Sequence, residues 1–366
     1  MMLNILLLED TETSITSCKD VIEEYFSNQI TVTPADEPQK AIDLLSNHFD
    51  AAIVDLRLKG NTEGSFFIEK MQELGVKIPM VIHTATPDDV LPNWCALEVF
   101  TRGDPKQGYK AIFEYLQKVL QTGITEIVGL SGLIEKKIQQ FYKDYFFYNR
   151  DLWIERASTD PQRVKDALYR SLIAQIDSEA ALHASDSYPE EFYIPAQDPY
   201  LYTGSIVVDK ASGKRFVILS PACDIALRDG KPKIKSITMC EIQPIETHGL
   251  TYNPSGYDFT GKKINKFNPL FQNSNDDKDC IRYHWLPNTK NFEGGIVNFT
   301  MPMSWPYEEF FSKYDLEPFR IARPFVKNIL ARFSSYYARQ GQPDVGKNEL
   351  LSNIKSTTSE HEVLMP

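Results

Sequence analysis

The sequence predicts an α/β domain at the N-terminus, built on a doubly wound five-stranded parallel sheet, and a smaller β-rich domain further along. Two observations predict the N-terminal part: short apolar runs alternate with segments of helical periodicity over residues 1–121, and two of the runs end in carboxylates. The third observation is a change to strand periodicity near Tyr188, which predicts a barrel-like α+β domain at 188–340. A helical hairpin linker at 122–187 separates the two.

Strands and helices alternate along the first 121 residues. The first predicted strand is apolar throughout, as expected for a strand covered by helices on both faces. The predicted strands are Leu3–Leu8, Ile30–Thr33, Ala51–Leu56, Met80–Ala85 and Leu97–Arg102. The predicted helices are Thr11–Phe26, Pro38–His48, Ser65–Leu74, a weak element at Asp88–Trp94, and Lys106–Leu120.

Composition limits the function classes. A chain of 366 residues is long enough for two or three cores, and its net charge of −11 argues against sequence-independent binding to nucleic acid. The apolar runs are shorter than the roughly 18–20 residues that cross a bilayer. The start of the chain lacks the basic residues and cleavage site of a signal peptide, so we expect a cytoplasmic protein. Its five cysteines are then thiols or metal ligands.

Polar residues gather where the predicted strands end. Glu9 and Asp10 end the first strand, Asp55 ends the third, Thr84 lies near the end of the fourth and Arg102 ends the fifth. Parallel strands bring these ends to one edge of the sheet, where such folds bind ligands. Three converging carboxylates repel one another, and their oxygens favour Mg²⁺ as the neutralising ion.

A carboxylate beside Mg²⁺ can attack phosphorus, so Asp55 is a candidate phosphoacceptor. A single aspartate at a strand end is more often a loop or helix cap. The convergence of several polar residues at one edge favours the site.

Four motifs, "LLLED", "IVDLRL", "GNTEG" and "VIHTAT", resemble the receiver domain of two-component response regulators over about the first third of the chain. The resemblance implies that Asp10 binds Mg²⁺ directly and that Glu9 binds it mostly through water. It implies that Asp55 ligates the ion and accepts a phosphoryl group from a histidine kinase, with the backbone carbonyl of Arg57 as a further ligand. Thr84 would move to bond the phosphoryl group.

The end of the fifth strand departs from the receiver pattern. Arg102 stands where receivers carry lysine, and Gly103 replaces the proline that follows. Arginine keeps the charge but presents a planar fork. Lys106 is a second candidate if the loop folds back. The fourth strand also carries His83, and the next helix is short, so the usual relay of activation is expected to be altered.

The segment after Gln121 predicts two helices, one over Leu133–Ala157 and one over Pro161–His183. Both are rich in apolar and aromatic residues at helical spacing. We favour packing of these helices within the chain, and pairing of two subunits into a homodimer is the alternative.

The C-terminal half predicts a β-rich output domain. "GSIVVDKASGKRFVILSPACD" indicates two strands around a turn. Further strands are predicted at Ser236–Pro244, Cys280–Leu286 and Gly295–Thr300, and a helix at Pro318–Tyr337. The polar tail, 341–366, is expected to be flexible.

The C-terminal half contains a candidate Cys₃His set of zinc ligands. Its members are Cys223, Cys240, Cys280 and His284. Zinc sites usually contain a close pair of cysteines, and this set has none. We therefore favour thiols without metal over a zinc site.

The basic residues of the last predicted helix are the chain's best nucleic-acid candidate. They are Arg320, Arg323, Lys327, Arg332 and Arg339. Such runs more often pair with acidic surface or face solvent, which we favour here. "SPACDI" and "RYHWLP" loosely resemble an uncharacterised bacterial domain with a Cys-Asp-Ile signature, which implies no activity.

We therefore expect a phosphoacceptor regulator rather than an enzyme, with a C-terminal domain that binds protein partners or with a phosphate-buffering role. The arrangement resembles the non-enzymatic regulator of bacterial two-component anti-phage defence systems such as Detocs. The alternative is an effector, gated by the receiver, whose C-terminal domain binds nucleic acid or carries an unrecognised catalytic activity. No hydrolase triad, P-loop or helix-turn-helix motif supports that alternative.

Overall fold

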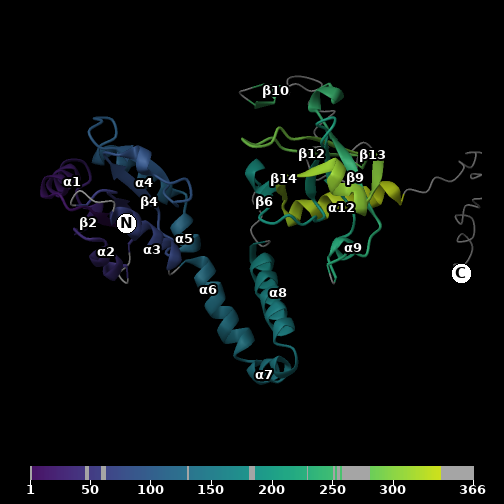
Figure 1. The fold of residues 1–366 in the computed structure, drawn as a ribbon, viewed down its shortest axis with the longest axis horizontal. Helices are drawn as coiled ribbons and strands as arrows, with labels where there is room; N and C mark the ends of the chain where they lie inside the picture. The colour runs from purple at the N-terminus through teal and green to yellow at the C-terminus, as the bar shows by residue number, and fades with distance from the viewer. Residues whose placement is uncertain are drawn as a thin grey trace, which may run out of the picture. The chain divides into compact units, whose positions relative to one another are not determined.

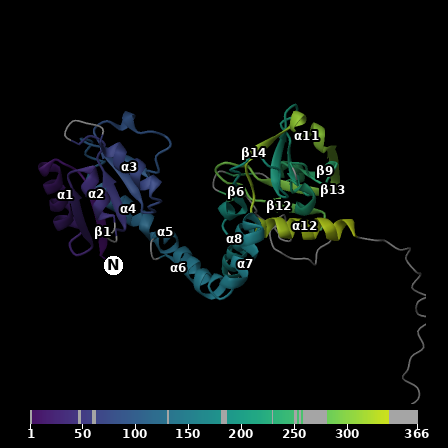
Figure 2. The ribbon, with the colours of Figure 1, turned by 60° about the horizontal axis from the view of Figure 1, so that its bottom comes forward.

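The chain divides into two compact units, Met1–Ala184 and Ser185–Pro366, drawn in Figures 1 and 2. The computed structural model describes residues 2–45, 49–58, 63–129, 132–180, 186–228, 230–249, 252–253, 256–257 and 281–338. Within these ranges no helix combines the length and apolarity that a bilayer span requires.

The N-terminal unit contains a parallel five-stranded sheet with the order β2-β1-β3-β4-β5, which confirms the predicted fold class. Alternate residues of β1 enter different cores: Ile5 and Leu7 pack with α1 and α4, and Leu6 and Leu8 pack with α2 and α3. The strands are β1 (Leu3–Leu8), β2 (Ile30–Ala35), β3 (Ala51–Val54), β4 (Met80–Thr84) and β5 (Glu98–Thr101). The helices are α1 (Glu12–Tyr25), α2 (Pro38–Leu44), α3 (Glu63–Glu73) and α4 (Tyr109–Gln121).

The weak element predicted at 88–94 is only a single 3₁₀ turn, η1 (Pro87–Asp89). The expectation of five helices around the sheet was therefore wrong. Pro92 disfavours helical geometry at the residue before it. Few residues therefore remain between Pro87 and Pro92 for a helix. Trp94 instead packs against the core on the α2–α3 face.

The helix predicted over 133–157 is interrupted. α6 (Leu133–Gln140) passes into a π-helical stretch, η2 (Phe141–Phe146), and a turn precedes α7 (Arg150–Thr159). Aromatic rings stack one turn apart in the interrupted region, Phe141 on Tyr145 and Tyr142 on Phe146. α8 (Pro161–Ala180) follows as the second predicted helix, and a short α5 (Ile124–Val128) precedes α6.

The C-terminal unit is built on a seven-stranded antiparallel sheet with the order β12-β13-β9-β8-β7-β14-β6. Its strands are β6 (Tyr193–Pro195), β7 (Ser205–Asp209), β8 (Arg215–Ile218), β9 (Ser236–Gln243), β12 (Tyr283–Leu286), β13 (Gly295–Pro306) and β14 (Tyr314–Ile321). Smaller elements are β10 (Tyr252–Asn253), β11 (Gly256–Tyr257), η3 (Pro189–Phe192), η4 (Ile245–His248), α9 (Ala222–Ile225), α11 (Tyr307–Lys313) and α12 (Arg323–Tyr337).

The seven-stranded sheet curls until its edge strands meet through side chains. The Tyr193 hydroxyl, on β6, donates a hydrogen bond of 2.7 Å to the carbonyl of Pro287, which follows β12. The Phe192 and Trp285 rings lie 6.4 Å apart at the same closure. The sheet is thus a half-barrel, as the β-rich prediction required.

The predicted C-terminal helix begins later than expected, because Pro318–Ile321 belong to β14 and α12 starts at Arg323. The basic residues do not share one exposed helix face. Arg320 stacks over the Tyr202 ring at 3.9 Å, and Arg332 is buried with Val326 and Ile329 on the inner side of α12. Arg339 lies outside the described residues.

His284 is enclosed beside Arg332. Neither ring nitrogen has a hydrogen-bond partner among the described residues, and burial lowers the pKa of His284 to about 3. Its ordinary pKa is 6.5. The folded state therefore holds a neutral imidazole, and protonation below pH 6.5 favours the unfolded chain.

We expect acid to destabilise the fold through His284. The contribution of the neutral His284 side chain to the free energy of unfolding is complete above pH 6.5 and is lost as the pH falls from 6.5 towards 3. Lowering the pH from 7.5 to 5.5 should cost about 1.4 kcal/mol through this one group. Denaturant unfolding at the two pH values should show a smaller loss for His284→Met than for the unmodified chain. If His284→Met and the unmodified chain lose the same unfolding free energy between the two pH values, His284 is not the source of the acid sensitivity.

Candidate functional site

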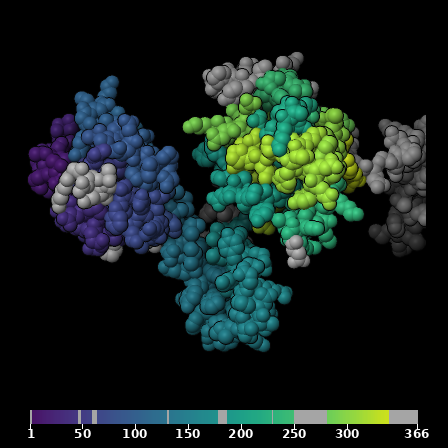
Figure 3. Space-filling model, viewed as in Figure 1, coloured from purple at the N-terminus to yellow at the C-terminus, as the bar shows by residue number. Residues whose placement is uncertain are grey.

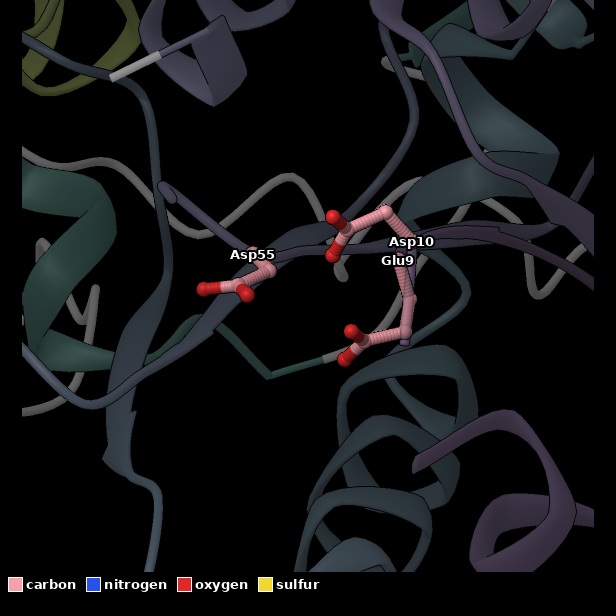
Figure 4. A group of neighbouring side chains, drawn as sticks. All are labelled: Glu9, Asp10 and Asp55. Atoms are coloured by element: carbon pink, nitrogen blue, oxygen red, sulfur yellow. The ribbon is translucent and has the colours of Figure 1, made fainter. Parts of the chain in front are cut away.

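The register of the parallel sheet brings two carboxylates to one edge. Leu8 pairs with Val54, so Glu9 and Asp55 follow at the same level, and the Asp55 N–H donates to the Leu8 carbonyl at 2.9 Å. Asp10 adds a third carboxylate. One carboxylate oxygen from each of Glu9, Asp10 and Asp55 lies within 4.8 Å of the others (Figure 4). The predicted convergence is therefore present in the structure.

Glu9 and Asp55 are buried and held by defined partners. Glu9 Oε1 accepts a hydrogen bond of 3.0 Å from the backbone N–H of Thr11. Asp55 Oδ1 accepts one of 3.3 Å from the N–H of Arg57. Asp10 is only half-buried, so it gives the cluster a side that solvent can reach.

Arg102 is the internal counter-ion of this cluster. Its Nη2 contacts Glu9 Oε2 and lies 3.1 Å from Asp55 Oδ2. Its backbone N–H donates to the Thr84 carbonyl at 2.8 Å, which ties the end of β5 to the end of β4. The residue that departs from the receiver pattern thus bridges two of the three carboxylates.

Burial and Arg102 act on Asp55 in opposite directions. Burial raises the pKa of Asp55, and the Arg102 charge, which is the next largest influence, lowers it. Burial prevails, and the pKa is raised overall. The carboxylate charge therefore depends strongly on a nearby cation.

The other three predicted site residues, Thr84, Arg57 and Lys106, differ in burial and in the partners of their side chains. Thr84 is fully buried at the end of β4, where it helps to lower the pKa of Asp55, and its Oγ1 lies 3.4 Å from the Thr86 hydroxyl. The Arg57 guanidinium turns away to Asp89, at 2.6 Å, and the role of its carbonyl as a ligand stays a prediction. Lys106 is exposed on the loop before α4, so the part assigned to it also stays a prediction.

Two features near the cluster were not predicted as site residues. His83, on β4, lies edge-on to Tyr109 with ring centroids 4.8 Å apart, and burial lowers the pKa of His83 to about 4. Gly64, on α3, packs so closely that a Cβ there would lie 2.1 Å from the Asp55 carbonyl oxygen. The "GNTEG" motif contains this glycine, but the close approach is a tertiary contact.

The residues at this edge fit a hard divalent cation. Glu9, Asp10 and Asp55 supply only oxygen donors, and Asp10 leaves room for the water ligands that Mg²⁺ usually retains. These three side chains would hold the ion. When bound, Mg²⁺ would supply positive charge against phosphoryl oxygens.

The predicted zinc set is not assembled by the described residues. Cys223 is exposed on α9, Cys240 is buried in the sheet core, where burial raises its pKa to about 12, and His284 lies on β12. Cys280 lies outside the described residues. Over the described part of the chain, Glu9, Asp10 and Asp55 form the one group that could hold a metal ion.

Comparisons with solved structures find response-regulator domains. The N-terminal domain of a response regulator/sensory box/GGDEF protein from Carboxydothermus hydrogenoformans is 20% identical, with 33% of this chain and 98% of that chain covered and a TM-score of 0.29. A receiver domain from Methanospirillum hungatei is 17% identical, with 35% of this chain and 100% of that chain covered and a TM-score of 0.29. A response regulator from Thermotoga maritima in complex with Mg²⁺ and BeF is 21% identical, with 31% of this chain and 99% of that chain covered and a TM-score of 0.26.

No protein-family model and no curated protein matches the sequence. The TM-scores of the structural matches are below 0.5. The functional assignment therefore rests on the topology and the site geometry of this chain.

Removing the Arg102 charge should make stability depend on Mg²⁺. In Arg102→Gln, Glu9 and Asp55 keep their burial and lose their counter-ion. Breaking a buried pair costs about 3–5 kcal/mol, and we expect about 2 kcal/mol here because Arg102 is partly exposed. Denaturant unfolding with a chelator should show this loss, and added Mg²⁺ should restore most of it.

Arg57→Gln is the matched control, because it removes an exposed guanidinium paired with Asp89. Its free energy of unfolding should change little and should respond to Mg²⁺ as the unmodified chain does. Equal behaviour of the two variants would contradict the counter-ion role of Arg102.

Adding a methyl group at Gly64 should disturb the backbone that carries Asp55. In Gly64→Ala the new Cβ meets the Asp55 carbonyl and the Leu56 Cα, so the loop must shift. We expect a loss of about 2 kcal/mol in unfolding free energy. Gly108→Ala is the control, because nothing lies within 4 Å of its Cβ position. Equal stability of the two variants would refute the close packing.

Proposed function

We propose that this protein is a response-regulator-type phosphoacceptor and that Asp55 receives the phosphoryl group. The observation that carries the proposal is the meeting of Glu9, Asp10 and Asp55 at the carboxyl edge of a parallel sheet. Thr84 and Arg102 come from the two neighbouring strand ends: Arg102 forms an ion pair with Asp55, and Thr84 helps to lower its pKa. This set combines a nucleophile, a cation site, a hydroxyl donor and a fixed positive charge.

The proposed donor is a phosphohistidine of a histidine kinase. An Asp55 carboxylate oxygen attacks phosphorus, and the new P–O bond forms as the P–N bond breaks. The imidazole leaves with the bonding electron pair and takes up a proton. Mg²⁺, held by the acidic cluster, would offset charge on the phosphoryl oxygens during this transfer.

Arg102 and Thr84 would receive the new phosphoryl group. The Arg102 guanidinium already lies against the Asp55 carboxylate, and its planar fork suits two phosphoryl oxygens. Thr84 is buried at the neighbouring strand end, where it helps to lower the pKa of Asp55. Arg102 would transfer its contact from the carboxylate to a phosphoryl oxygen, and the Thr84 hydroxyl would move to donate a hydrogen bond to another.

For the C-terminal unit we propose a protein-interaction role rather than catalysis. An apolar hollow of about 670 Å³, beside α9 and α11, is lined by exposed aromatic side chains such as Tyr200 and Phe311. A nucleic-acid role is less well supported, because Arg332 is buried and Arg320 stacks on Tyr202. Phosphate buffering by the receiver-like unit is a further proposal, and a part in anti-phage defence is a proposal from the resemblance.

Phosphorylation tests the proposal directly. Incubation with Mg²⁺ and acetyl phosphate should add one phosphoryl group to the intact mass of the unmodified chain and none to Asp55→Asn. Asp88→Asn is the matched control, because it removes an exposed carboxylate of the same unit outside the cluster. It should be modified like the unmodified chain.

A chain that gains no phosphoryl group from acetyl phosphate or from a phosphorylated histidine kinase would refute the proposal. Equal modification of Asp55→Asn would also refute it, because the acceptor would then be another residue.

A further inference from the structure

The helical segment 133–180 exposes apolar side chains that its own helices leave uncovered. Among its described residues, only Val164 is a buried apolar side chain. We define the hairpin surface as Ile138, Tyr142, Phe147, Leu152, Tyr169 and Ile173, all of them exposed. Figure 3 shows this segment as the teal block of the space-filling view.

α7 is too short to depend on its own propensity. It has 10 residues, and isolated helices below about 12–15 residues are marginal in water. The helices of the segment contact one another through defined pairs: the Tyr145 hydroxyl bonds Ser171 at 3.1 Å, and the Tyr145 ring packs on Trp153. Burial of the exposed apolar side chains would add stabilisation to the segment.

The charge of the segment indicates what covers it. Residues 133–180 carry eight acidic and eight basic residues and have no net charge. Residues 1–132 carry 20 acidic and 10 basic residues, a net charge of −10. Two copies of the chain would repel through residues 1–132 but can approach through the segment 133–180, which carries no net charge.

We propose that the hairpin surface is the homodimer interface of this protein. Two helical hairpins, one from each copy, would pair about a twofold axis into a four-helix bundle. α8 provides the long element: its 20 residues span about 30 Å, and Tyr169 and Ile173 lie one turn apart on its outer side. This proposal is independent of phosphorylation at Asp55.

A second copy fits this surface better than nucleic acid or an anionic membrane, because those partners need net positive charge. The mixture of aromatic and aliphatic side chains is typical of homodimer interfaces, which are more apolar than transient ones.

Solution mass tests the interface. Light scattering with size exclusion, over a range of concentrations from about 1 to 100 μM, should give two chains for the unmodified protein, as expected for an interface of standard size. The double variant Tyr142→Glu and Tyr169→Glu should give one chain, or a dissociation constant raised at least about 100-fold. Both side chains are more than half exposed, so the variant should keep its helical circular dichroism.

Phe66→Glu is the matched control, because Phe66 is an aromatic residue of α3 with 52% exposure and lies outside the hairpin surface. It should remain a dimer. A single-chain mass for the unmodified protein throughout the range would overturn the proposal, and so would a double variant that dimerises as tightly as the unmodified chain.

Discussion

The carboxyl edge of the N-terminal sheet depends on the neutralisation of buried carboxylates. Glu9 and Asp55 are buried at adjacent strand ends, and burial raises the pKa of Asp55. The guanidinium of Arg102 lies against both and makes this arrangement compatible with a folded sheet. The same charge lies where a phosphoryl group on Asp55 would need a partner, so one residue serves stability and the proposed chemistry.

Close packing of backbone supports this charge balance. The β1–β3 register sets Glu9 beside Asp55, and Gly64 lets α3 approach the loop that begins at Asp55. The short η1 turn leaves Asp89 beside Arg57, whose guanidinium is thereby kept apart from the acidic cluster. The loops around the site are therefore joined by specific ion pairs and by one glycine contact.

Most of the N-terminal sheet could be predicted, because buried parallel strands are continuous apolar runs and end in polar residues. The C-terminal unit was predicted less completely. Arg320 and Arg332 looked alike in sequence, yet one belongs to β14 and stacks on Tyr202, and the other is buried beside His284. Helical periodicity over 133–157 likewise did not show the π-helical interruption, which coincides with aromatic stacking one turn apart.

The sequence by itself determined which carboxylates lie at strand ends and that these ends share one edge, because the alternation of strands and helices fixes a parallel sheet. Only the tertiary structure decided that Arg102, rather than Lys106, contacts Glu9 and Asp55, and that Cys223 and Cys240 differ in burial. Side-chain pairing across a sheet edge depends on loop geometry and on burial. Neither property is local in the chain.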